Sequence, residues 1–132
     1  MPAILPPGSP SRAWFAVAVW MALTVILSTF PIGGVQPSVP DADKLGHAAV
    51  YCVLAFLTAR AWRKHGSGRA AVVERTLGMA LLFGALMELV QSRVGRDPSL
   101  ADWVADGVGA VVGIGFWRAW TIVAGMTLER GR

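Results

Sequence analysis

The chain has 132 residues, of which 55% are hydrophobic and only 15% are charged. Soluble domains carry about a quarter charged residues, so this composition disfavours a soluble globular domain. The formal net charge is +4, but the basic residues flank apolar stretches, a distribution that indicates membrane topology and no nucleic-acid partner.

Four apolar blocks follow one another along the chain, and each is close to the ~20 residues that cross a ~30 Å hydrocarbon layer as a helix. They run from Ala13 to Phe30, Leu45 to Trp62, Leu77 to Val94 and Trp103 to Trp120. A helix satisfies its own backbone hydrogen bonds, which lipid cannot do. We therefore predict an all-α membrane protein with one domain, a four-transmembrane-helix bundle with spans at roughly 13–31, 45–62, 76–94 and 102–121.

The segments outside the blocks are polar or contain Pro and Gly, as loops do. Residues 1–11 predict a disordered tail. The first block is followed by no cleavage site of the A-x-A type, so we expect it to be a retained span. Residues 63–75 predict a basic, solvated loop, and residues 95–99 predict a tight turn in which Ser99 can cap the last helix.

Basic residues are distributed unequally between the two ends of the predicted bundle. Three of the twelve fall on one face, at Lys44, Arg93 and Arg96. The other nine fall on the face that carries both chain ends, at Arg12, Arg60, Arg63, Lys64, Arg69, Arg75, Arg118, Arg130 and Arg132. The positive-inside rule then predicts that both termini are cytoplasmic, in a multi-pass protein of the cell inner (cytoplasmic) membrane.

Glu88 lies near the end of a long apolar run, and a carboxylate at such a depth is expensive and indicates a functional site. Helical spacing places further polar side chains at the same depth on two other spans. Together they predict a polar pocket that opens to the outer face of the membrane. Its expected residues are Asp43, Lys44, His47, Tyr51, Glu88, Gln91, Arg96, Asp102 and Asp106.

A carboxylate beside a histidine can perform general acid–base catalysis. We expect Glu88 to be the central acid or base with His47 as its partner and Asp106 as a third catalytic group. Lys44 and Arg96 can hold an anionic phosphate. The remaining ligand-binding candidates are Tyr51, Gln91, Asp102 and Asp43. The expected partner is a membrane lipid or envelope precursor, with no cofactor.

Three alternatives compete with this interpretation. The acids can pair with Lys44 and Arg96 and only fix the helix packing. A metal site is disfavoured because His47 is the one histidine on this side of the membrane, and we expect no metal. Proton- or ion-coupled transport is disfavoured because the cytoplasmic halves of the spans offer only Arg60 and Arg118, which can extend to the interface.

Small residues recur at four-residue spacing on two spans. The fourth span carries Ala105, Gly109 and Gly113, and the third carries Ala80 and Gly84 on the face that leads to Glu88. Such stripes let helices approach closely. They indicate internal packing surfaces, and the Gly109/Gly113 stripe can also serve a homo-oligomer.

The polar residues occur in a characteristic order over nearly the whole chain. The segments are Ser28 to Pro31, Asp43-Lys44-Leu45-Gly46-His47 with Tyr51, Glu88-Leu89-Val90-Gln91, Arg96, and Asp102-Trp103-Val104-Ala105-Asp106-Gly107-Val108-Gly109. This order resembles the VanZ-like family, with its D-K-x-x-H-x-x-x-Y, E-x-x-Q and R…D-x-x-x-N-x-x-G patterns. Position 106 departs from the family, which usually has Asn there.

The resemblance implies a multi-span integral membrane protein. The family is named for a member associated with resistance to teicoplanin, a lipoglycopeptide. The resemblance therefore implies an effect on lipoglycopeptide susceptibility as one expectation. A housekeeping role in the envelope fits equally well. The competing interpretation is a non-enzymatic accessory or structural membrane protein, in which the polar cluster only fixes the packing of the helices.

Overall fold

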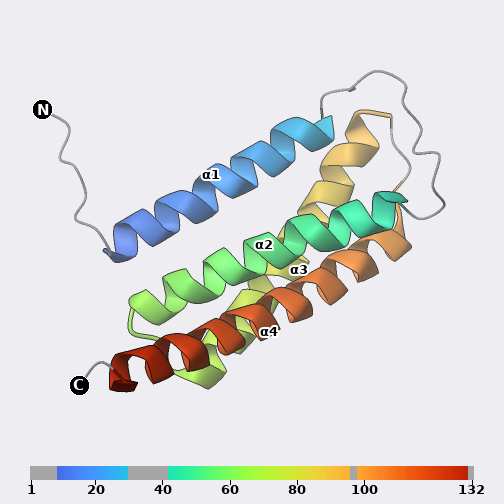
Figure 1. Ribbon diagram of the computed structural model, residues 1–132. Coiled ribbons are helices and arrows are strands. Elements are labelled where there is room, and N and C mark those ends of the chain that lie inside the picture. The colour runs from blue at the N-terminus through green and yellow to red at the C-terminus, as the bar shows by residue number, and fades with distance from the viewer. Residues whose placement is uncertain (1–8, 30–41, 96–97, 131–132) are drawn as a thin grey trace, which may run out of the picture.

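The computed structural model describes residues 9–29, 42–95 and 98–130, with the side chains of the last range described to Gly125. Over these residues the chain is all-helical (Figure 1). The helices are α1 (Pro10–Thr29), α2 (Ala42–Lys64), α3 (Arg69–Arg93) and α4 (Leu100–Arg130). Each contains a stretch that is long and apolar enough to cross a membrane. The prediction of an all-α bundle with four helices of membrane-spanning length is thereby confirmed.

The helices alternate in direction, so the start of α1 and the end of α4 lie at the same end of the bundle (Figure 1). In consequence α2 and α4 run parallel to each other. They also form the most extensive contact between any two helices, whereas α1 packs chiefly on α2. The α2–α4 pair is therefore the centre of the fold, and α3 and α1 are added to it.

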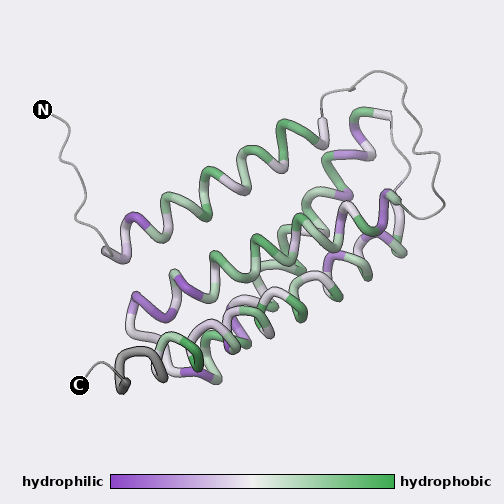
Figure 2. The backbone as a smooth tube through the Cα atoms, viewed as in Figure 1, coloured by the Kyte–Doolittle hydropathy of each residue, from purple (hydrophilic) through white to green (hydrophobic). Residues whose placement is uncertain are grey.

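Large apolar side chains cover the outside of the bundle. Phe15 is 68% exposed, Leu82 64% and Ile122 60%. Figure 2 shows hydrophobic residues along the helix middles and hydrophilic residues concentrated toward their ends. A water-soluble protein of this size does not expose so much contiguous apolar surface, whereas lipid tails solvate it at no cost.

Glycines set the distance between α2 and α4. Gly109 and Gly113 are buried, and a β-carbon on either would collide with the backbone carbonyl of Ala48 or Cys52, respectively. From the first contact to the second, the chain advances four residues on each helix, as expected for two parallel helices in close contact. The Gly109/Gly113 stripe is thus a packing surface within one chain.

The start of α3 differs from the sequence-based prediction. Residues 69–75 were expected to belong to a solvated loop, yet they form the first two turns of α3, and the connection shrinks to residues 65–68. Two alanines and two valines in this segment favour a helix once they pack, and Val72 is fully buried. Gly66, with φ of +94°, supplies the left-handed residue that reverses the chain. The charges of Arg69 and Arg75 concealed this helical turn from a hydropathy argument.

Candidate functional site

The candidate site lies at the end of the bundle where α2 begins, α3 ends and α4 begins. His47 comes from α2, Glu88 and Gln91 from α3, and Asp102 and Asp106 from α4. Because the helices alternate in direction, these residues of three helices come together at one end of the bundle, as the sequence predicted. Of the predicted disordered tail over residues 1–11, residues 1–8 lie outside the described residues, whereas Pro10 and Ser11 already belong to α1. Arg96 also lies outside the described residues, as do Phe30 and Pro31 in the first segment of the family resemblance.

The closest polar contact joins His47 and Asp106. The Nδ1 atom of His47 lies 2.9 Å from Oδ1 of Asp106. The Asp106 side chain is 1% exposed, while that of His47 is 22% exposed. An ionised Asp106 accepts a hydrogen bond from the Nδ1–H group and fixes this tautomer, which leaves Nε2 as the basic nitrogen. A buried carboxylate that orients a histidine is the arrangement of a general base.

Asp102 lies on the other side of the same imidazole. Its Oδ2 atom is 3.9 Å from Nε2 of His47, beyond hydrogen-bond distance, and its side chain is 18% exposed. The helical spacing of Asp102 and Asp106 puts both carboxylates on one face of α4. The backbone N–H of Asp102 donates to Oγ of Ser99 at 3.2 Å, so Ser99 caps α4 as predicted. A carboxyl group therefore lies beside each ring nitrogen of His47.

Gly84 makes room for the Asp106 carboxylate. An ideal β-carbon on Gly84 would lie 2.8 Å from Oδ2 of Asp106 and 3.2 Å from Cδ1 of Trp103. Trp103 is itself held, because its indole N–H donates to the carbonyl oxygen of Leu81 at 3.0 Å. The sequence indicated that the Ala80/Gly84 stripe lies on the face of α3 that leads to Glu88, and the structure shows that Gly84 on this stripe faces Asp106 of α4.

We expect Gly84→Ala to disturb the His47–Asp106 pair more than the fold. The added methyl group must displace the end of a short side chain, for which overpacking costs about 1–3 kcal/mol. Helix propensity returns up to about 1 kcal/mol of this. The measurement is the thermal midpoint in detergent beside the histidine ¹⁵N chemical shifts, with Gly78→Ala as control, because a β-carbon at Gly78 meets no atom within 4 Å. Unchanged His47 shifts in Gly84→Ala would contradict the expectation.

Glu88 contacts the backbone at the start of α4. Its Oε2 atom accepts a hydrogen bond from the backbone N–H of Ser99 at 2.7 Å. The hydrogen-bond partner of His47 is Asp106, whereas that of Glu88 is the Ser99 amide. Glu88 is half-buried and ties the end of α3 to the residue that caps α4. The physical reason is the tight connection through Gly95, with φ of +83°, which folds Ser99 back onto the last turns of α3.

Tyr51 lies one helical turn beyond His47 and deeper in the bundle. It is 2% exposed, and its ring centroid is 6.0 Å from that of Phe83. Its hydroxyl oxygen is buried without a hydrogen-bond partner among the described residues. A buried hydroxyl without a partner is costly, and the Asp106 carboxyl group lies within reach to provide one.

The remaining candidates surround the cluster at different depths. Asp43 is exposed in the first turn of α2, and Lys44 is half-buried beside it. Gln91 is 5% exposed on α3. Among the described residues, no three His, Cys, Asp or Glu side chains are arranged to hold a metal ion. The other histidine, His65, is exposed in the connection between α2 and α3 at the opposite end.

Sequence comparison adds no relative to this description. No protein-family model matches the chain, and neither a curated protein nor a solved structure is similar to it.

Proposed function

We propose that the chain is an integral membrane protein of the VanZ-like type that binds or modifies an envelope lipid or lipid-linked precursor at the His47–Asp106 cluster. The observation that carries this proposal is a nearly fully buried aspartate held 2.9 Å from a histidine inside membrane-spanning helices. An apolar pair would serve helix packing better, so a buried polar pair favours a function. The segments that resemble the VanZ-like family contribute both residues.

The proposed chemistry follows from the geometry of His47. Asp106 holds Nδ1, and Nε2 accepts a proton from a hydroxyl or phosphate group of the ligand. The Tyr51 hydroxyl provides a further hydrogen-bonding group at the deep side. Lys44 and Arg96 supply positive charge for an anionic group at the membrane surface. This assignment transfers the central role from Glu88 to the His47–Asp106 pair.

The orientation is part of the proposal. By sequence position, nine of the twelve basic residues fall at the start of α1, around the connection between α2 and α3, or in the second half of α4 and after it. The positive-inside rule assigns this end of the bundle to the cytoplasm. After Cys52→Ala removes the one cysteine, Pro98→Cys should react with an impermeant thiol reagent from outside and His65→Cys only after the membrane is opened. The reverse labelling would refute this orientation.

The test of the site compares His47→Gln with His65→Gln. Glutamine at position 47 can still donate a hydrogen bond to Asp106 but has no basic nitrogen. His65→Gln makes the same chemical change at an exposed position at the far end of the bundle, so it serves as the control. Native mass spectrometry of each protein, purified in its own lipids, should show a specific bound species in the wild type and His65→Gln, and its loss in a folded His47→Gln. The same bound lipids in all three proteins would refute the site.

Two observations favour the alternative of a non-enzymatic accessory protein with a structural cluster. Glu88 binds the Ser99 amide, and Asp106 fills the space beside Gly84, both of which are packing roles. This alternative predicts that His47→Gln reduces the amount of folded protein and cellular function together. Under the site proposal, the folded amount stays constant while function is lost.

A further inference from the structure

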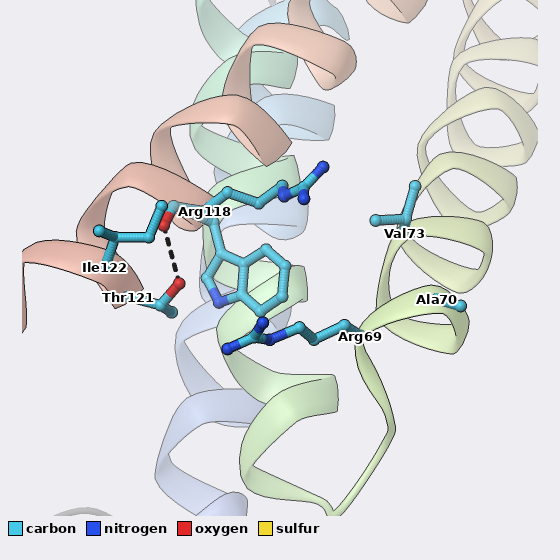
Figure 3. Close-up of a pocket in the computed structure, with 7 residues that line it drawn as sticks. Arg69, Ala70, Val73, Arg118, Thr121 and Ile122 are labelled. Atoms are coloured by element: carbon cyan, nitrogen blue, oxygen red, sulfur yellow. Dashed lines mark hydrogen bonds between the residues drawn. The ribbon is translucent and has the colours of Figure 1, made fainter. Parts of the chain in front are cut away.

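A second feature lies at the opposite end of the bundle from His47. A cavity of about 200 Å³ opens between the start of α3 and the second half of α4 (Figure 3). It is lined by Arg69, Ala70, Val73, Trp117, Arg118, Thr121 and Ile122. Figure 3 shows Arg69 reaching from the start of α3 toward α4 and Arg118 reaching from α4 toward α3. Two guanidinium groups therefore share one small cavity.

Among the described residues, no acid forms an ion pair with either guanidinium group. Within the described residues, the ion pairs are those of His47 with Asp102 and Asp106, and neither involves Arg69 or Arg118. The first turn of α3 contains no acid, and Gly68 provides no side-chain cap, so the positive end of that helix adds to the same field. Thr121 directs its hydroxyl to the carbonyl oxygen of Arg118 at 2.8 Å and contributes no charge.

Other arginines at this end have partners within the protein. Arg63 donates to the carbonyl oxygen of Ser67 at 3.1 Å, and Arg75 donates to Oγ of Ser67 at 3.0 Å. Arg75 also lies over the ring of Trp62, 5.0 Å from its centroid. Arg69 and Arg118 differ from these because they line a cavity. Their donors are available to an anion, and guanidinium groups match the oxygens of a phosphate geometrically.

The size and walls of the cavity narrow the kind of anion. A volume of about 200 Å³ is below the roughly 300 Å³ at which pockets begin to enclose a whole small molecule. It suits a headgroup whose remainder stays outside. Val73 and Ile122 form apolar walls, and Ile122 and Phe116 are each 60% exposed on the apolar surface of α4. A ligand with a phosphate and long apolar chains satisfies both parts.

We propose that the cavity between Arg69 and Arg118 binds the phosphate group of an anionic glycerophospholipid, with the acyl chains lying along Val73 and Ile122. Basic pockets between membrane helices are known to hold anionic headgroups in this manner. The site is separate from the proposed His47–Asp106 function, and it gives the protein a specific lipid at the end that carries both termini.

The test is native mass spectrometry of the full chain in detergent, titrated with phosphatidylglycerol, phosphatidylcholine or inorganic phosphate. The site variant is Arg69→Gln/Arg118→Gln. The control is Arg12→Gln/Lys64→Gln, which removes the same charge from exposed positions at the same end. We expect wild type and control to bind phosphatidylglycerol within twofold of each other, at least tenfold more tightly than phosphatidylcholine. The site variant should lose at least tenfold.

A second variant covers the case in which the double substitution fails to fold. Ala70→Glu places a carboxylate inside the cavity at a helix N-terminus, where an acid favours the helix, and it should weaken phosphatidylglycerol binding to a similar extent. Equal losses in site variant and control would show diffuse attraction to basic surface and overturn the proposal. Equal binding of phosphatidylcholine, or displacement of the lipid by equimolar inorganic phosphate, would overturn the assignment to an anionic lipid.

Discussion

Gly113→Ala is expected to be, together with Gly109→Ala, the most destabilising methyl-sized change in the bundle. The added β-carbon would collide with the carbonyl oxygen of Cys52 and lie 3.0 Å from the Ala55 side chain. The first obstacle is helix backbone, so relief requires α2 and α4 to separate along their length. Overpacking usually costs about 1–3 kcal/mol, occasionally more, and we expect about 3 kcal/mol here. Gly109→Ala meets the carbonyl of Ala48 in the same way and should behave alike.

The matched control is Gly115→Ala, two residues further along the same helix. A β-carbon there meets no atom within 4 Å, so only helix propensity acts, and it favours alanine by up to about 1 kcal/mol. Unfolding in detergent, followed by circular dichroism, should therefore separate the two variants by about 4 kcal/mol. Equal stabilities would mean that α2 and α4 are further apart in the membrane than in this structure.

The close approach also determines where the candidate site forms. Gly109 and Ala48 pack together close to the His47–Asp106 contact, because Ala48 follows His47 on α2 and Gly109 lies three residues after Asp106 on α4. A separation of α2 from α4 would therefore lengthen the hydrogen bond between Nδ1 of His47 and Oδ1 of Asp106. For this reason we expect Gly109→Ala to affect the site as well as stability, and Gly113→Ala, one turn further, to affect chiefly stability.

Hydropathy and helical spacing predicted the architecture because both depend on local sequence. The four apolar blocks became α1 to α4, and the polar residues of three helices met at one end. The start of α3 was misplaced because Arg69 and Arg75 lower the local hydropathy, although the alanines and valines between them form helix and Val72 is fully buried. Hydropathy averaged over a window detects segments in contact with lipid. The first turns of a membrane helix can lie outside the lipid, so this average does not detect them.

Sequence spacing could not predict which side chains of the site form hydrogen bonds with one another. Periodicity placed His47, Glu88 and Asp106 at one depth, but the choice of partner depends on the register between α2 and α4. That register is set by the Gly109 and Gly113 contacts, and it selects Asp106. Glu88 was drawn to the amide of Ser99 by a turn, part of which, residues 96–97, lies outside the described residues. Gly84 was noticed as a small residue, and only the packed structure connects it to Asp106.

His47→Leu is expected to have the second large effect, because it leaves the Asp106 carboxylate buried without a partner. Removing one member of a buried pair costs about 3–5 kcal/mol, and we expect about 3 kcal/mol since His47 remains partly exposed. Asp106→Asn alone should cost only about 1 kcal/mol, because the amide oxygen still accepts a hydrogen bond from Nδ1–H. The double variant should recover most of the His47→Leu loss, because no charge is then buried.

The double-mutant cycle in detergent measures the coupling between the two residues, with exposed His65→Leu as control for removing an imidazole. A coupling of about 2 kcal/mol or more means that Asp106 is ionised and depends on His47 for its charge. In that state Nε2 is left as the basic nitrogen, as the proposed acid–base role requires. A near-neutral His47→Leu would mean that Asp106 is buried in its protonated form. His47 would then have no ionised partner to fix its tautomer, and the acid–base role would fail even if the protein still bound lipid.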